Sequence, residues 1–297
     1  MNEGVVSIYL HNTHTETSGY KMIRGQFFRL LPYQVLLLVV NSVNGIVDGI
    51  FASNLIGQDA MAAIGLFAPM DHFMYAVSIM LVSGSQILYG RYIGKNQRQK
   101  LANLFSVNLA FSAIISLVVG GAMAWAASGG FTNFMVSGQA ERAALNEYLL
   151  GQAIGIHGLI LGQQLFAFLS MENQTSLTIK ASLVCVAVNT VMDFLLVDWI
   201  NMGIFGLALG TAISLWAFFA VMAWYYLIGR SELKISLSGL RWSEAGNIVR
   251  PGYSGSISRF LEMVRCVVVN FLILEYVGVV GMSSFAASNS VMAIFCL

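Results

Sequence analysis

The chain has 297 residues, of which 57% are hydrophobic and only 10% are charged, and its mean hydropathy is +0.74. Because soluble domains carry roughly 25% charged residues, this composition excludes an ordinary soluble protein. The net charge of +1 provides no basic surface for nucleic acid. The three cysteines lie in apolar runs without the spacing of a metal or redox site, so we interpret them as small buried hydrophobes.

Long apolar runs recur along the chain and predict an all-α, polytopic membrane protein. Runs of about 20 residues or more cross the hydrocarbon as helices, because lipid leaves no other partner for backbone polar groups. We place spans at 27–53, 60–90, 101–127, 143–171, 176–197, 202–229, 253–275 and from 281 onward. The polar residues 1–20 have no apolar core, which argues against a signal peptide.

The basic residues predict the orientation of these spans. Twelve Lys or Arg residues fall in the N-terminal tail and in alternate loops, and only Arg142 falls in the intervening loops. Since cytoplasmic loops carry the excess of Lys and Arg, the N-terminus is predicted to be cytoplasmic. The twelve are Lys21, Arg24, Arg29, Arg91, Lys95, Arg98, Lys100, Lys180, Arg230, Lys234, Arg241 and Arg250.

Two segments about 220 residues apart share landmarks, as expected of a parallel repeat. Each begins at a proline, Pro32 or Pro251, and reaches a glycine, Gly57 or Gly278, about one span later. We therefore expect a cytoplasmic tail at 1–25, a six-helix lobe at 26–229, a cytoplasmic loop at 230–250, and the start of a second lobe at 251–297. The repeat also predicts that this chain is part of a parent of about 440 residues with about 12 helices.

Polar residues deep in apolar spans point to function, because an aspartate at a helix centre costs about 2.5–3.5 kcal/mol. Asp48 lies in the first span, with Asn44 one turn before it, and Asn189 and Asp193 share a face of the fifth. Together with Thr211 in the sixth span they form a candidate cation-coupling site. Their oxygens suit a hard cation such as Na+, and the two carboxylates could instead exchange a proton. The alternative is a hydrogen-bonded network that only ties helices together.

A second group, Asp71, Glu262 and Arg265, could line a substrate cavity. Glu262 could equally neutralise Arg259 and Arg265, which lie one turn on either side of it. Asp71 is close to Pro69, which we expect to kink its helix, and an interfacial polar residue is the alternative for it. Glycines spaced by GxxxG predict close helix packing. They are Gly151, Gly155, Gly158 and Gly162 in the fourth span and Gly206 and Gly210 in the sixth.

Four stretches resemble the multidrug and toxic compound extrusion (MATE) family, most of all its prokaryotic branch. They are VDGIFASNLIGQDAMAAIGL, RYIGKNQRQKLAN, NTVMDFLLV and GIFGLALGTAIS, and the resemblance covers about residues 27–297. The family implies twelve helices in two lobes, a central cavity and alternating access. Its first-lobe cation site uses residues that Asp48, Asn189, Asp193 and Thr211 match one by one, and Glu262 could match a glutamate that some members use in helix seven. Helices nine to twelve have no counterpart in this chain.

The resemblance implies a transporter rather than an enzyme: an antiporter that exports drugs or organic cations in exchange for Na+ or H+, with no other cofactor. It further implies a monomer in the bacterial cytoplasmic membrane. One alternative is a flippase for lipid-linked sugars of the related exporter class, which would want several cationic residues facing the cavity. A seven-helix receptor is the alternative from another class. The eighth apolar run and the repeat argue against it, and the seventh span has no lysine for a retinal Schiff base.

Overall fold

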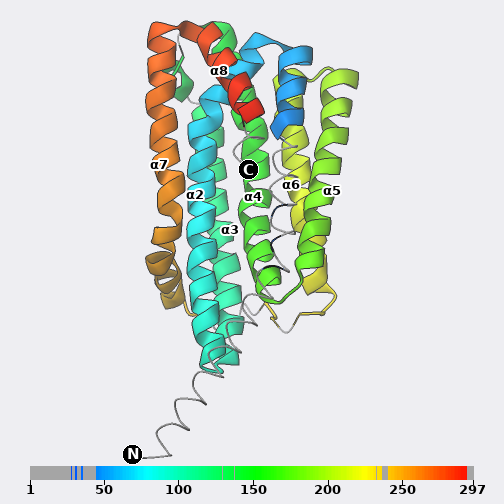
Figure 1. Cartoon of the computed structure of the whole chain (residues 1–297), viewed down its shortest axis with the longest axis vertical. Coiled ribbons are helices and arrows are strands. Elements are labelled where there is room, and N and C mark those ends of the chain that lie inside the picture. The colour runs from blue at the N-terminus through cyan, green and yellow to red at the C-terminus, as the bar shows by residue number, and fades with distance from the viewer. Residues whose placement is uncertain are drawn as a thin grey trace, which may run out of the picture.

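The computed structural model describes residues 28, 31, 35, 45–128, 130–136, 138–231, 233–235 and 240–292, which form a bundle of long helices without a strand among them (Figure 1). The long helices are α2 (Gln58–Gly94), α3 (Arg98–Ser128), α4 (Gln139–Met171), α5 (Thr175–Asp193), α6 (Gly203–Leu227), α7 (Ser243–Tyr276) and α8 (Gly278–Met292). Three short segments complete the described part: the π-helix η1 (Ala52–Ile56), the 3₁₀-helix η2 (Phe131–Phe134) and the π-helix η3 (Phe194–Trp199).

The helices have the dimensions and composition of membrane spans, as the sequence predicted. Within the described residues, five are long and apolar enough to cross a bilayer: α2, α3, α4, α5 together with η3, and α6. The helix α7 has 34 residues, but its middle carries charged side chains. A shorter apolar helix at Gly45–Ile56 precedes α2. The all-helical, polytopic fold class is therefore confirmed.

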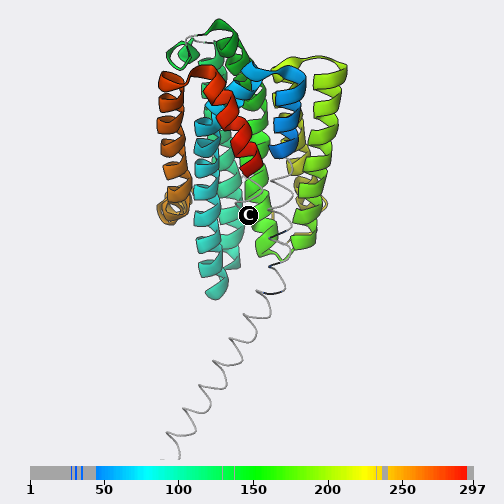
Figure 2. The ribbon, with the colours of Figure 1, turned by 45° about the horizontal axis from the view of Figure 1, so that its top comes forward.

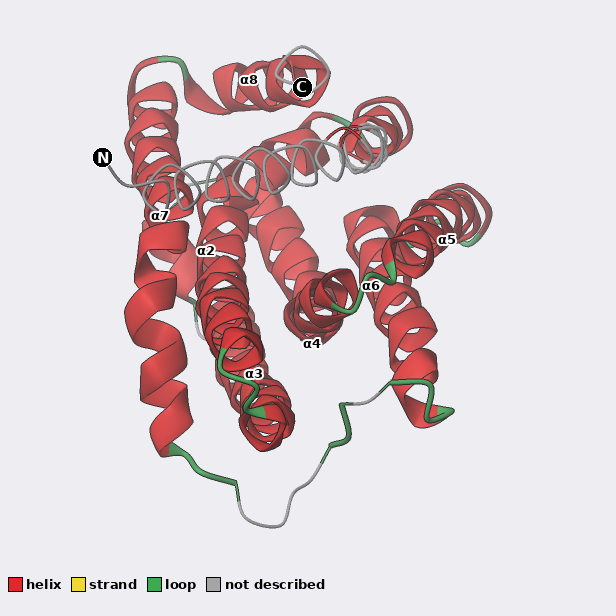
Figure 3. Ribbon diagram, turned by 60° about the horizontal axis from the view of Figure 1, so that its bottom comes forward, coloured by secondary structure: helices red, strands yellow, loops and turns green. Residues whose placement is uncertain are grey.

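The helices α2 to α7 run alternately up and down the long axis of the bundle, and α8 crosses one end of it (Figure 2). Figures 1 and 3 both place α7 alongside α2, while α5 and α6 lie together on the other side of α4. The beginning of α2 and the end of α7 consequently lie at the same end of the molecule as α8. This arrangement sets the first helix of the second repeat against the second helix of the first.

Short turns reverse the chain direction between several of the helices. Three turns contain an asparagine with a positive φ, at Asn96, Asn173 and Asn201, a conformation that asparagine tolerates better than most residues. The paired landmarks Gly57 and Gly278 also have positive φ, of 122° and 78° respectively. Each follows a helix and starts the next, so these two positions of the repeat have the same structural role. The proline landmark at position 32 lies outside the described residues.

The helices α4 and α6 pack through the predicted glycine face. A methyl group on Gly155 would come within 2.9 Å of the Ala212 Cα, and one on Gly158 within 2.8 Å of the Leu215 carbonyl carbon. Glycine thus lets the two backbones approach more closely than any side chain would permit. The GxxxG prediction is confirmed for the glycines of α4, whereas Gly206 and Gly210 of α6 face η3 and α5.

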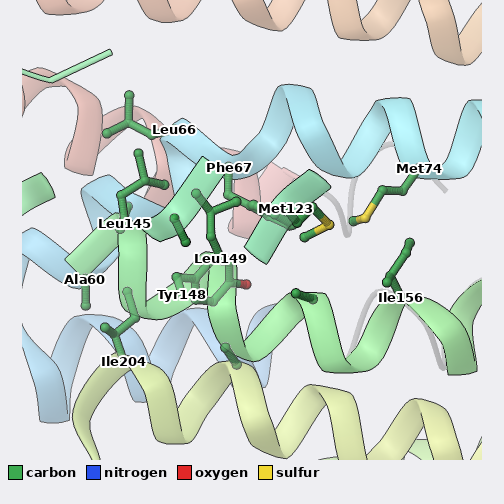
Figure 4. Packing of buried hydrophobic residues seen from close by; sticks show 14 of the residues in the cluster. Ala60, Leu66, Phe67, Met74, Met123, Leu145, Tyr148, Leu149, Ile156 and Ile204 are labelled. Carbon is green, nitrogen blue, oxygen red and sulfur yellow. The ribbon is translucent and has the colours of Figure 1, made fainter. Parts of the chain in front are cut away.

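Buried apolar side chains from α2, α3, α4, α6 and α8 form one core (Figure 4). Phe67 on α2 and Tyr148 on α4 meet edge to face, with ring centroids 5.1 Å apart and an angle of 81° between the rings. Such an arrangement is preferred by aromatic quadrupoles and fixes the relative rotation of the two helices. The same α4 surface then continues toward the candidate site.

The start of α7 differs from the prediction. The sequence predicts a loop at 230–250 and a span at 253–275, whereas α7 begins at Ser243 and contains Pro251 in its interior. Proline removes one intrahelical hydrogen bond, to the carbonyl four residues earlier. That carbonyl belongs to Asn247, which is exposed, so the helix continues through the proline with the freed carbonyl on an exposed residue.

Candidate cation site

The structure brings four of the five predicted coupling residues together. Asp48 belongs to the helix before α2, Asn189 and Asp193 to α5, and Thr211 to α6. The Asp48 carboxylate lies close to the Asp193 and Asn189 side chains. The Asn189 amide donates to Thr211 Oγ1 over 3.4 Å, and the fifth residue, Asn44, lies outside the described residues. Three helices thus contribute oxygens to one location.

The site contains several buried oxygen atoms that receive no hydrogen bond from any described residue. Asn189 and Asp193 are both 0% exposed. Asp48 Oδ1, Asn189 Oδ1 and both Asp193 carboxylate oxygens accept no hydrogen bond within the described part of the chain. Because buried polar groups are nearly always paired, a cluster of orphan acceptors indicates a missing partner beyond the described side chains. Either a cation or a proton between the carboxylates would provide it.

The donor set consists of oxygen atoms. Among the described residues, no group of three or more His, Cys, Asp or Glu side chains is placed to hold a metal ion. The site instead combines the two carboxylates with the neutral oxygens of Asn189 and Thr211. Thr211 Oγ1 donates its own proton to the Leu207 carbonyl over 3.2 Å, so towards the other groups of the site it acts as an acceptor. Oxygen ligands of this kind match the preference of a hard cation.

Local backbone features position Asp193. The helix α5 ends at this residue, and the π-helix η3 follows at once. π-helical segments are rare and occur frequently at functional sites. Across the helix interface, a methyl group on Gly210 would lie 2.5 Å from Asp193 Oδ1. The absence of a side chain at 210 therefore makes room for the carboxylate.

Two residues escaped the sequence analysis. Gly210 had been assigned only to helix packing, and its contact with a carboxylate depends on how α5 and α6 pair. Tyr148 is buried on α4, hydrogen-bonds with Gln152, and lies near enough to Asp48 and Asp193 to interact electrostatically with them. The signal for it was available, since Tyr148 and Gln152 are polar residues four apart on one face of an apolar helix.

The second predicted group is divided between α2 and α7. Glu262 Oε2 and the Arg265 guanidinium are 2.7 Å apart, an ion pair one turn along α7. Arg259 lies over the Tyr75 ring, 6.0 Å from its centroid, and interacts electrostatically with Asp71. Glu262 therefore has the neutralising role that the sequence allowed. That these residues also line a substrate cavity stays a prediction.

Comparisons with known proteins agree with the sequence resemblance. The family model MatE matches residues 35–195. No curated protein matches the chain. A solved structure described as the inward-facing conformation of a multidrug resistance MATE family transporter of the MOP superfamily has a TM-score of 0.77 and 20% identity, over 88% of this chain and 61% of that one. The outward-facing conformation of such a transporter has a TM-score of 0.75 and 19% identity, over 90% of this chain and 63% of that one.

A third structure, a MOP superfamily transporter from Pyrococcus furiosus, has a TM-score of 0.75 and 20% identity, over 90% of this chain and 63% of that one. Its description reports a reverse polarity of the binding pocket that suggests a different function. At such identities the likeness concerns the fold. The chain spans less than two thirds of the length of these structures.

Proposed function

The chain belongs to the MatE family, and on that premise we propose that a transporter containing it exports drugs or organic cations in exchange for Na+ or H+. The observation that carries this proposal is the buried Asp48 and Asp193 pair, whose oxygens have no donor among the described residues. A structural network would be expected to satisfy its own acceptors. A site that exchanges a cation during each cycle needs acceptors left for that cation.

The coupling follows from charge. Without a cation, two carboxylates in contact repel each other, which favours separation of the first helix from α5. A bound Na+ or proton removes that repulsion and favours the closed arrangement of Asp48, Asn189 and Asp193. A ligand shifts a two-state equilibrium only by its different affinity for the two states. The cation gradient thereby drives the change between inward-facing and outward-facing forms.

The proposed transporter has two lobes, the first at 26–229 and the second from 251 onward. It lies in the bacterial cytoplasmic membrane with its N-terminus in the cytoplasm. The drug or organic cation would bind between the lobes, near Asp71 and Glu262. The flippase alternative is weaker, because Arg265, one of its two cationic candidates, is already paired with Glu262.

Substitution of Asp193 by Asn tests the proposal. In proteoliposomes containing the transporter, we expect Asp193→Asn to reduce substrate export against its gradient to background, because an amide cannot balance the charge of a bound cation. The matched control is Asp198→Asn, since Asp198 lies five residues later and is exposed. Normal export by the Asp193 variant would show that the carboxylates are structural. Imposing a Na+ gradient and a pH gradient separately identifies the coupling ion.

A further inference from the structure

The interface between α2 and α7 contains a hydrogen bond that repairs a defect caused by a proline. Pro69 lies inside α2 and has no backbone N–H, so the Gly65 carbonyl, four residues earlier, loses its normal helical partner. Asn270 on α7 donates its side-chain amide to this same carbonyl over 2.9 Å. Asn270 is buried, with 6% of its surface exposed. The orphan acceptor of one helix is thus satisfied by the other.

The opposite part of the interface is held differently. A methyl group on Gly84 would collide with the Ile248 carbonyl, and one on Gly252 with the Met80 carbonyl, so the two backbones touch there. Further toward the same end, the Tyr92 hydroxyl donates to Glu244 Oε2 over 2.9 Å. This end of α7 is fixed by backbone contact, whereas at the other end Asn270 provides a side-chain hydrogen bond between α7 and α2.

We propose that Asn270 is a positioning residue for the conformational change: it latches the end of α7 to α2, and α7 pivots about the Gly84 and Gly252 contact when the latch opens. Gly65 and Gly84 are 19 residues apart, or about 28 Å along the helix. A small rotation at the pivot therefore separates Asn270 from the carbonyl. By the predicted orientation the latch lies at the outer end, so it holds the outward opening closed.

Pro69 makes this latch specific. In an unbroken helix the Gly65 carbonyl would already be satisfied, and an amide from α7 would add little. With the proline present, release of Asn270 exposes an unpaired carbonyl, which is unfavourable unless water enters. The latch accordingly opens only when that end of the interface becomes wet, as it does when a transporter faces outward. This last step rests on the proposed function, whereas the bond itself does not.

A double-mutant cycle tests whether the carbonyl is the reason for Asn270. In the purified chain in detergent, we expect Asn270→Leu to lower the folded-to-unfolded ratio about tenfold, because it leaves a buried carbonyl unpaired. In a Pro69→Ala background, the restored N–H serves that carbonyl, so the same substitution should have little effect. An equal loss of stability in both backgrounds would show that Asn270 does not act by satisfying the Gly65 carbonyl. Asn247→Leu, at an exposed position of α7, controls for the loss of an asparagine.

Cross-linking tests whether the bond holds the helices together. Gln58 Nε2 donates to Ser283 Oγ over 3.3 Å near the latch, so the rate at which a short bifunctional thiol reagent joins Gln58→Cys to Ser283→Cys, once the native cysteines are serines, reports on this end of the interface. We expect Asn270→Leu to slow this reaction severalfold when Pro69 is present and to have little effect with Pro69→Ala, and we expect Asn247→Leu to leave the rate unchanged. An unchanged rate with Asn270→Leu would exclude the latch. Neither experiment measures transport, so failure of the latch and failure of the proposed function are distinguishable.

Discussion

At the scale of single residues, the site depends on Gly210 as much as on its carboxylates. An alanine there would place its methyl group 2.5 Å from Asp193 Oδ1, so the carboxylate must move away from Asp48 and Asn189. We expect Gly210→Ala to reduce coupled export about tenfold or more, because misplacing a ligand by about 1 Å removes most of its contribution. Initial export rates in proteoliposomes measure the effect.

The control for this substitution is Gly121→Ala. Gly121 is also a helical glycine, but a methyl group on it would meet nothing within 4 Å. It should leave export unchanged and slightly favour the helix. If Gly210→Ala transports as well as Gly121→Ala, Asp193 is not held in place by the shape of α6.

The polar residues of the site could be predicted from the sequence, but the residues whose role depends on contacts with another helix could not. Asp48, Asn189, Asp193 and Thr211 could be predicted to form one site, because carboxylates and amides stand out in apolar spans and their spacing sets the helix face. Gly210 and Asn270 could not be predicted, since the role of each comes from an atom on another helix. The partner of Asn270 is a backbone carbonyl, which no pattern of side chains reveals.

At the scale of helices, the α4 and α6 pair is limited by backbone contact. A methyl group on Gly158 would meet the Leu215 carbonyl carbon at 2.8 Å and the Trp216 nitrogen at 2.9 Å, and backbone atoms cannot turn aside as a side chain does. We expect Gly158→Ala to destabilise the folded chain by about 1–3 kcal/mol. Thermal unfolding in detergent measures this, with Gly90→Ala as control because space is open around Gly90. Equal unfolding midpoints would contradict the close packing.

Helix existence was easier to predict than helix detail. The apolar runs predicted each of the described long helices, because crossing lipid requires an uninterrupted span. The start of α7 was misplaced, since Pro251 was taken as a boundary although its freed carbonyl belongs to the exposed Asn247. The π-helices η1 and η3 left no trace in the sequence, because widening a turn by one residue hardly alters an apolar pattern.

At the scale of the whole molecule, the cation site and the latch lie on different helix contacts. The site joins the first helix to α5 and α6, and the latch joins α2 to α7. Tyr148 on α4 interacts electrostatically with Asp48 and Asp193 and also packs on Phe67 of α2. It therefore provides a physical contact through which cation binding and the α2 and α7 interface can influence each other.

The role of the latch as an outer gate depends on the orientation of the chain, which labelling can establish. Asn96 in the turn between α2 and α3 and Asn133 in η2 are both exposed, and they lie at opposite ends of α3. With the native cysteines replaced, we expect Asn133→Cys to react with a membrane-impermeant maleimide in intact cells and Asn96→Cys to react only after permeabilisation, since the basic loops stay in the cytoplasm. The reverse result would place Asn270 at the cytoplasmic end, and the latch would then hold the inward opening closed.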